Sequence, residues 1–276
     1  MASYLRPRDL DEALRALGQG PRTVLAGGTD YYPARVGKPL DDEILDITGI
    51  DALLRIEEDD AGWRIPARCT WSALLCADLP PLFDGLKAAA REVGGVQIQN
   101  AGTLCGNVCN ASPAADGVPN LMAMDARVEL RSLGGTREIP IDAFVLGNRR
   151  TARAADELVT ALRVPRPPRP ARGGFAKLGA RRYLVISIVM SACVVEVADG
   201  RVAAARIAVG ACAPVARRLP RLEARLAGHP LGVAPPAIEA ADLAPLAPID
   251  DVRGSATYRG DAVATQLQRL IGEMLS

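Results

Sequence analysis

The sequence predicts an α+β fold arranged in two domains. First, helix-like and hairpin-like patterns both recur along the chain. Second, the chain has 276 residues, 49% of them hydrophobic, whereas a single domain usually spans ~100–200 residues. Third, the segment VPRPPRPARGG from Val164 places four prolines in seven residues, which stiffens the chain and prevents regular strand pairing. We therefore expect the domain boundary at this segment.

The first part of the chain alternates short helices and strands. RDLDEALRALGQG from Arg8 predicts an amphipathic helix that ends at Gly18 and Gly20. RTVLAGGTD from Arg22 predicts a short buried strand that runs into a glycine turn, and DEILDI and WRIPARCTWSALL continue a strand, turn, strand pattern. LFDGLKAAAREVGG from Leu82 predicts a helix closed by two glycines.

Two hairpins and two further helices complete the expected elements. DARVELRSLGGTREIPI from Asp125 predicts the first hairpin. Beyond the proline segment, LVISIVMSACVVEVADGRVAAARIAVGACA predicts two apolar strands around the turn Asp199-Gly200. RLPRLEARLAG and AVATQLQRLIGEML predict helices near the C-terminal end.

Composition excludes several classes of protein. A net charge of +1 gives no electrostatic footprint for nucleic acid. The first residues lack the apolar core of a signal peptide, and the longest apolar run, from Tyr183, is too short for a membrane span. Six cysteines spread over the chain form no disulfide framework. These features predict a cytoplasmic protein.

The stretch NAGTLCGNVCNASPAAD, from Asn100 to Asp116, is unusually rich in small and polar residues. It fits a tight structural loop, a metal site built on Cys105 and Cys109, or a surface moulded to a large polar ligand. The metal site has the weakest support, because structural zinc sites need a second pair of ligands at a suitable spacing. Cys193 and Cys212 lie in apolar strands and are most simply core residues.

Two segments suggest a pair of backbone cradles for phosphate. LAGGTD, from Leu25 to Asp30, would expose consecutive backbone N–H groups after a strand, although an ordinary glycine turn is the commoner explanation of so short a motif. Residues 102–103 and 106–107 could form the second cradle. Nearby side chains could add hydrogen bonds; these are Asn107, Asn110, Ser112 and Asp116. The dinucleotide and phosphate-loop fingerprints are both absent.

Other candidate sites have simpler explanations. His229 is the single histidine, so a hydrolase built on a Ser-His-Asp or Cys-His arrangement is excluded as a main hypothesis. The basic segment KLGARRY, from Lys177 to Tyr183, is either a solvated face or a source of cationic contacts to an anionic cofactor.

Four stretches resemble, in the same order, the flavoprotein (medium) subunit of the xanthine dehydrogenase and carbon monoxide dehydrogenase family. They are AGGTD, QNAGTLCGNVCNASPAADGVPNLMAMDARVEL, FAKLGARR and YRGDAV. The resemblance covers nearly the whole chain. It implies a two-lobed FAD-binding domain of the vanillyl-alcohol-oxidase (PCMH) type over residues 1–167, with lobes of roughly 1–55 and 56–167. A smaller C-terminal α+β domain with an antiparallel sheet is implied over residues 172–276.

The same resemblance implies the residues that contact FAD. The first diphosphate loop matches Val24, Leu25, Ala26, Gly27, Gly28, Thr29, Asp30 and Tyr31, and the second matches Thr103, Leu104, Cys105, Gly106 and Asn107. Asp116 matches a cofactor-contacting aspartate, Lys177 a lysine that approaches the flavin, and Val93 and Val159 apolar or backbone contacts, while Ser112 adds a hydroxyl. In the family the position of Cys105 is usually glycine. FAD binding is compatible with this change if Cys105 has a negative φ and points away from the cofactor.

The resemblance implies an electron-transfer subunit of a molybdenum hydroxylase, active only in complex. Non-covalent FAD would take electrons from a small 2Fe-2S iron–sulfur subunit, next to a large molybdopterin subunit, and pass them to NAD⁺, oxygen or another acceptor. The iron–sulfur clusters and the molybdenum cofactor would lie on those partners. We expect docking beside Lys177, Arg181 and Tyr183. The alternatives are a stand-alone FAD-dependent oxidoreductase and a non-catalytic assembly subunit that has lost FAD because of Cys105.

Overall fold

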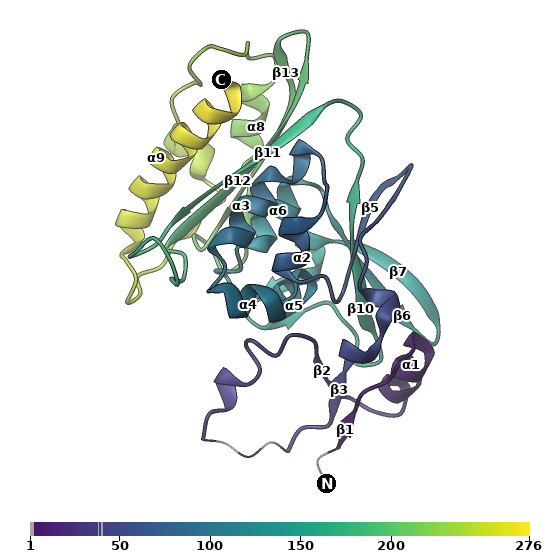
Figure 1. Ribbon diagram of the computed structural model, residues 1–276. Coiled ribbons are helices and arrows are strands. Elements are labelled where there is room, and N and C mark those ends of the chain that lie inside the picture. The colour runs from purple at the N-terminus through teal and green to yellow at the C-terminus, as the bar shows by residue number, and fades with distance from the viewer. Residues whose placement is uncertain (1–2, 38, 40) are drawn as a thin grey trace.

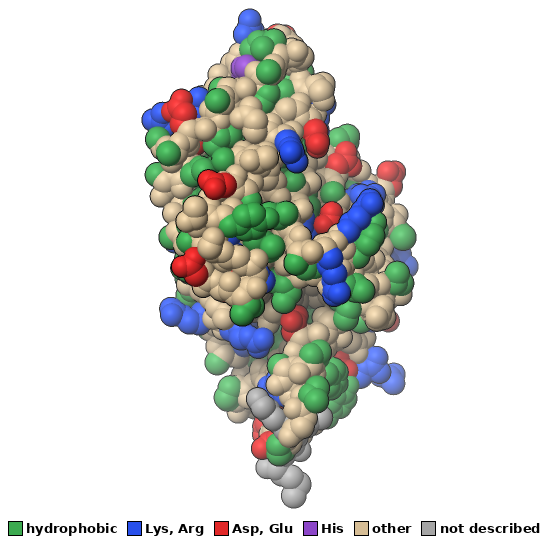
Figure 2. Space-filling model, turned by 90° about the vertical axis from the view of Figure 1, so that its left-hand side faces the viewer, with side chains coloured by type: hydrophobic (Ala, Val, Ile, Leu, Met, Phe, Trp, Pro, Cys, Tyr) green, Lys and Arg blue, Asp and Glu red, His purple; other side chains and the backbone are tan. Residues whose placement is uncertain are grey.

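A small parallel sheet forms the N-terminal lobe of the computed structural model, which describes residues 3–37, 39 and 41–276. Strands β1 (Tyr4–Leu5), β2 (Thr23–Leu25) and β3 (Ile44–Asp46) lie in the order β1-β3-β2. Helix α1 (Leu10–Gly18) connects β1 to β2 and confirms the predicted helix, which ends at Gly18. The Asp9 carboxylate caps its first turn by accepting a hydrogen bond from the Glu12 backbone at 2.8 Å. This lobe lies at the bottom of Figure 1, and the outline of the molecule narrows above it in Figure 2.

An antiparallel sheet of five strands follows. It consists of β4 (Glu57–Asp59), β5 (Gly62–Pro66), β6 (Arg127–Ser132), β7 (Gly135–Pro140) and β10 (Leu158–Pro165), in the order β4-β5-β10-β6-β7. The predicted hairpin from Asp125 is confirmed as β6 and β7, which pair from Arg127 with Pro140 to Ser132 with Gly135. A short hairpin of β8 (Val145–Gly147) and β9 (Arg150–Thr151) precedes β10.

Short helices link the strands of this sheet. They are α2 (Trp71–Cys76), α3 (Asp84–Glu92), α4 (Val96–Ala101), α5 (Leu104–Asn110), α6 (Gly117–Ala123) and α7 (Ile141–Phe144), with a 3₁₀ turn at 81–83. Three further 3₁₀ turns, at 33–35, 47–49 and 51–53, come before this sheet. Two expectations are wrong here. The second half of WRIPARCTWSALL is helix α2, because Thr70 caps its first turn by accepting from the Ala73 backbone. Residues 104–110 are helix α5 rather than a loop, since Thr103 caps it in the same way.

The C-terminal part is an antiparallel sheet covered by helices on both faces. The sheet consists of β11 (Ala171–Leu178), β12 (Val189–Ala198), β13 (Arg201–Gly210) and β14 (Arg217–Arg218), and the helices that follow are α8 (Pro220–Leu226), the 3₁₀ helix Ala240–Leu243 and α9 (Ala256–Leu275). The predicted turn between β12 and β13 is confirmed: Asp199 and Gly200 have φ of +51° and +69°.

The near-continuous apolar sequence of β12 follows from burial on both faces of this sheet. Cys193 and Val195 belong to the core shared with α8 and α9, whereas Ala192 and Val194 belong to the core of the preceding part of the chain. Helices α3 and α6 pack on that second face, and α9 packs on the first (Figure 1). Within the described residues, no helix is both long and apolar enough to cross a membrane.

Candidate functional site

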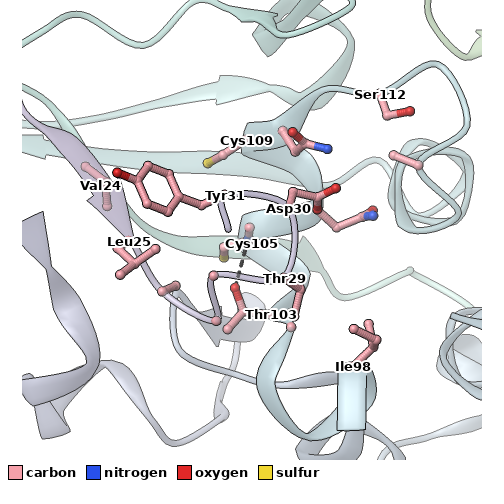
Figure 3. Close-up of a pocket in the computed structure, with 18 of the residues that line it drawn as sticks. Val24, Leu25, Thr29, Asp30, Tyr31, Ile98, Thr103, Cys105, Cys109 and Ser112 are labelled. Atoms are coloured by element: carbon pink, nitrogen blue, oxygen red, sulfur yellow. Dashed lines mark hydrogen bonds between the residues drawn. The ribbon is translucent and has the colours of Figure 1, made fainter. Parts of the chain in front are cut away.

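A cavity of about 690 Å³ lies where the N-terminal lobe, helices α4 and α5 and the β11–β12 loop come together. This volume is within the range of small-molecule and cofactor sites. Figure 3 shows the glycine loop after β2 on one side of it and helix α5 on the other. Its lining includes the predicted residues Val24–Tyr31, Val93, Thr103, Cys105, Gly106, Asn107, Ser112, Asp116, Val159 and Lys177. Leu104 is the exception, because its side chain is fully buried in the core.

The loop after β2 needs glycine at two positions. A Cβ atom on Gly27 would lie 1.9 Å from the carbonyl oxygen of Ala101, so this loop contacts the backbone at the end of α4. Gly28 has a φ of +67°, a conformation that favours glycine. The backbone N–H groups of residues 27–31 donate no hydrogen bond to any other described residue. They are therefore available to an anion in the cavity.

Helix α5 presents its first turn to the cavity. The Thr103 hydroxyl accepts a hydrogen bond from the Gly106 backbone at 2.9 Å, drawn as a dashed line in Figure 3. The Asn107 side chain accepts one from the Gly117 backbone at 3.2 Å, which ties α5 to α6. The expected second loop is thus helix α5, and its last residue, Asn110, lines the cavity together with Ser112 just beyond the helix.

Cys105 has the backbone conformation that the sequence analysis requires, although the residue still forms part of the cavity lining. It lies within α5, has no positive φ and is only 2% exposed. Its thiol donates a weak hydrogen bond to the carbonyl of Ile65 on β5, with a sulfur-to-oxygen distance of 3.8 Å. Burial raises the pKa of this thiol well above its usual range. Cys105 is therefore a neutral group directed at the five-stranded sheet.

A buried ion pair forms part of the cavity wall. Asp116 Oδ2 is 2.6 Å from Lys177 Nζ, and their side chains are 8% and 3% exposed. Ser187 Oγ donates to the other carboxylate oxygen at 2.6 Å. Burial raises the pKa of Asp116, and Lys177 opposes that rise. The Lys177 side chain therefore offers almost no surface to a partner, whereas Arg181 and Tyr183 are exposed. Docking beside this segment stays a prediction.

Several lining residues were missed from the sequence. Ile98 of α4 and Trp71 of α2 add apolar surface, and Val185 and Ile186 come from the β11–β12 loop. Arg149 and Arg153, beside the β8–β9 hairpin, add positive charge; no signal in the sequence distinguishes them from other surface arginines. Cys109 also faces the cavity, as Figure 3 shows. Across the described part of the chain, no cluster of three or more His, Cys, Asp or Glu side chains could hold a metal.

Comparison with known proteins agrees with this geometry. The profile described as the FAD binding domain in molybdopterin dehydrogenase matches residues 1–167, and that of the CO dehydrogenase flavoprotein C-terminal domain matches residues 175–274. The chain is 30% identical to the nicotine 6-hydroxylase medium subunit of Paenarthrobacter nicotinovorans, over 98% of this chain and 96% of that protein.

Two further similarities point the same way. The nicotinate dehydrogenase FAD-subunit of Eubacterium barkeri is 34% identical over 72% of this chain and 70% of its own length. Among solved structures, a chain of reconstituted CO dehydrogenase from Oligotropha carboxidovorans superposes with a TM-score of 0.86 at 25% identity, covering 100% of this chain and 99% of that one. The predicted α+β fold is therefore confirmed.

Proposed function

The chain belongs to the family of FAD-binding subunits of molybdopterin dehydrogenases, and we propose that its cavity binds one FAD without a covalent bond. The observation that carries this proposal is the glycine loop, whose backbone N–H groups at residues 27–31 have no partner among the described residues. Such a cradle suits the diphosphate of FAD, because converging donors stabilise phosphate oxygens. Arg149 and Arg153 add positive charge beside the same cavity.

The rest of the lining suits the other parts of the cofactor. Thr103, Gly106 and Asn107 bring a helical turn close to the glycine loop, so that the two segments can hold the diphosphate between them. Val159, Ile98 and Val185 supply apolar walls for the rings, and the Lys177 ammonium offers a cation in the cavity lining. When bound, FAD supplies the redox chemistry, since a flavin exchanges electrons singly or in pairs, while these residues bind and orient it.

We further propose that this subunit works within a complex. Its relatives are medium or FAD subunits of dehydrogenases and hydroxylases. A small 2Fe-2S subunit would supply electrons from a large molybdopterin subunit, and NAD⁺, oxygen or another compound would accept them. We place the protein in the cytoplasm, with its domains at 1–167 and 172–276.

The cofactor can be tested on the purified chain. We expect a yellow protein with a flavin absorption spectrum, and release of the flavin into solution on acid or heat denaturation. Mass spectrometry of the supernatant should identify FAD rather than FMN. Flavin that stays with the precipitated chain would contradict non-covalent binding, and failure of the refolded or apo-protein to take up added FAD would contradict the function itself.

The complex can be tested by co-expression with candidate iron–sulfur and molybdenum subunits, followed by size-exclusion chromatography. We expect co-elution, and we expect the isolated chain to leave purines, aldehydes and N-heterocycles unoxidised. The substitution Arg181→Glu, which reverses the charge of an exposed side chain, should weaken co-elution if the β11–β12 loop is part of the interface. Turnover of such substrates by the isolated chain would replace this proposal with a stand-alone flavoenzyme.

A further inference from the structure

We propose that Ser187 is a positioning residue for the cofactor cavity, acting through Asp116 and Lys177. The inference rests on the proposed binding of FAD. Ser187 does not itself line the cavity, and its side chain is fully buried. Its hydroxyl donates to Asp116 Oδ1 at 2.6 Å, a short, charge-assisted hydrogen bond in a water-poor setting.

The Asp116 carboxylate is shared between two donors. Ser187 occupies one oxygen and the Lys177 ammonium the other, at 2.6 Å in both cases. Lys177 Nζ also donates to the backbone carbonyl of Glu92 at 3.3 Å. Because an ammonium has three N–H groups, one is left for a ligand in the cavity that Lys177 lines. The orientation of the carboxylate therefore fixes where the remaining N–H points.

The backbone around Ser187 is held from the opposite side by the C-terminal part of the chain. Its carbonyl accepts a hydrogen bond from Arg253 Nη1 at 2.8 Å, and the next carbonyl, of Ile188, accepts one from Arg259 Nη1 at 2.6 Å. Both arginines are paired with Asp251, at 2.7 Å and 2.6 Å. The hydroxyl thus projects from a fixed backbone, which is what an orienting group requires.

The same carboxylate joins the two ends of the β11–β12 loop. Lys177 is near the end of β11, and Ser187 comes just before β12. Between them, Val185 and Ile186 form part of the cavity wall. Loss of the Ser187 hydroxyl would therefore affect both the direction of the Lys177 ammonium and the position of this apolar wall.

The expected effect of Ser187→Ala is a change at the bound flavin. Without the hydroxyl, the negative charge of Asp116 is compensated by Lys177 alone, so less positive charge is available to the cofactor. We expect FAD affinity to fall on the order of tenfold, as for loss of a hydrogen bond to a charged group. The reduction potential of the bound flavin should also become more negative, because nearby positive charge favours the reduced, anionic form.

The experiment compares three variants of the full chain. Ser187→Ala removes the hydroxyl, Ser187→Thr retains it, and Ser191→Ala is the matched control. Ser191 is equally buried and lies on β12, where its hydroxyl donates to Gln266 at 2.7 Å, and it does not line the cavity. FAD is first removed, and each apo-protein is titrated with FAD while flavin fluorescence is followed. The reduction potential and the visible spectrum of the bound flavin are then recorded. The melting temperature of each apo-protein shows whether the variant is folded.

A positioning role predicts weaker binding and a lower potential for Ser187→Ala, recovery in Ser187→Thr, and wild-type values in Ser191→Ala. If Ser187→Ala and Ser191→Ala both bind FAD within twofold of wild type with the same potential, Ser187 has only a structural role and the inference is wrong. If the wild-type apo-protein does not bind FAD at all, the proposed function fails instead, and the inference falls with it.

Discussion

The Lys177 ammonium and the Asp116 carboxylate form an ion pair with an N–O distance of 2.6 Å, in which neither side chain is more than 8% exposed. Lys177 lies on β11 of the C-terminal sheet, and Asp116 immediately precedes α6 in the first part of the chain. The pair therefore joins the two parts at the wall of the cavity. It thus contributes to the stability of the fold as well as to the electrostatics of the site.

Removing one member of this pair should destabilise the protein more than removing both. Asp116→Asn leaves the Lys177 charge buried without an anion, and we expect a loss of about 3–5 kcal/mol in the free energy of unfolding. The double variant Asp116→Asn/Lys177→Met leaves no unpaired charge, so its loss in the free energy of unfolding should be smaller. Denaturant unfolding of the apo-proteins measures this. A double variant whose loss equals the sum of the two single losses would show that the residues do not interact.

The glycine loop should tolerate no side chain at Gly27. Gly27→Ala places a methyl group 1.9 Å from the Ala101 carbonyl oxygen, so the loop must move away from α4 and its N–H groups lose their alignment. We expect FAD affinity to fall at least tenfold, which is about 1.4 kcal/mol. Gly260→Ala is the control, because Gly260 lies inside α9 with open space around it. That change should leave affinity intact and stabilise the chain by roughly 0.5–1 kcal/mol.

Cys105→Gly should affect stability more than cofactor binding. The Cys105 side chain packs into the core beside β5, and its backbone is helical. The change removes buried contacts and introduces a helical glycine, so we expect a loss of about 1–3 kcal/mol in the free energy of unfolding. FAD affinity should stay within a few-fold of wild type. Cys105→Ala is the comparison that keeps the helix propensity. A tenfold fall in affinity for both variants would show that Cys105 contacts the cofactor.

Local patterns allowed much of the fold to be predicted from the sequence. The Asp199-Gly200 turn lies between two apolar strands, and the glycines after β2 mark a close backbone approach, so both features are encoded by neighbouring residues. Helices α2 and α5 were missed for a different reason. Each is short, and its single local signal is a capping threonine, Thr70 or Thr103, which is weak when no glutamate or glutamine follows three residues later.

The candidate site was predictable only where residues adjacent in the sequence act together. The glycine loop and Asp116 could be found from the central motifs and the resemblance they carry. Ser187, Val185 and Arg149 could not, because their roles depend on the tertiary arrangement of the β11–β12 loop and the β8–β9 hairpin around the cavity. The pairing of the buried Lys177 side chain is of the same kind, because its partner Asp116 is distant in the sequence.

Glu129 should make stability depend on acid pH. Burial alone raises the pKa of Glu129, but hydrogen bonds from Arg64 and Thr160, at 2.8 Å and 2.6 Å, outweigh it and hold the pKa below the ordinary value of 4.5. Because the pKa of Glu129 is lower in the folded protein, its carboxylate binds a proton more tightly in the unfolded chain than in the folded protein. The contribution of Glu129 to stability is thus complete above pH 4.5 and is lost as the pH falls through the pKa of the folded state.

Unfolding free energies at several pH values measure this effect. Glu129→Gln should be less stable than wild type at pH 7 by about 2–4 kcal/mol, since it breaks a mostly buried pair, and its stability should fall less steeply below pH 4.5. Glu57→Gln is the control, because Glu57 is 60% exposed and contacts the same Arg64 at 3.4 Å. It should follow the wild-type curve. Parallel curves for wild type and Glu129→Gln would contradict the assignment.

Bound FAD should protect one cysteine from a thiol reagent. Cys109 is exposed and faces the cavity, so a thiol reagent can reach it in the apo-protein. The surrounding protein raises the pKa of its thiol to about 11, which slows labelling because the thiolate is the reactive form. Cys76 is exposed away from the cavity and provides an internal control. Mass spectrometry of peptides after timed labelling gives both rates.

Saturating FAD should slow labelling at Cys109 by about tenfold or more and leave Cys76 unchanged, since a ligand that fills the cavity excludes the reagent from it alone. Equal rates at Cys109 with and without FAD, in a protein shown to bind FAD, would place the cofactor outside this cavity.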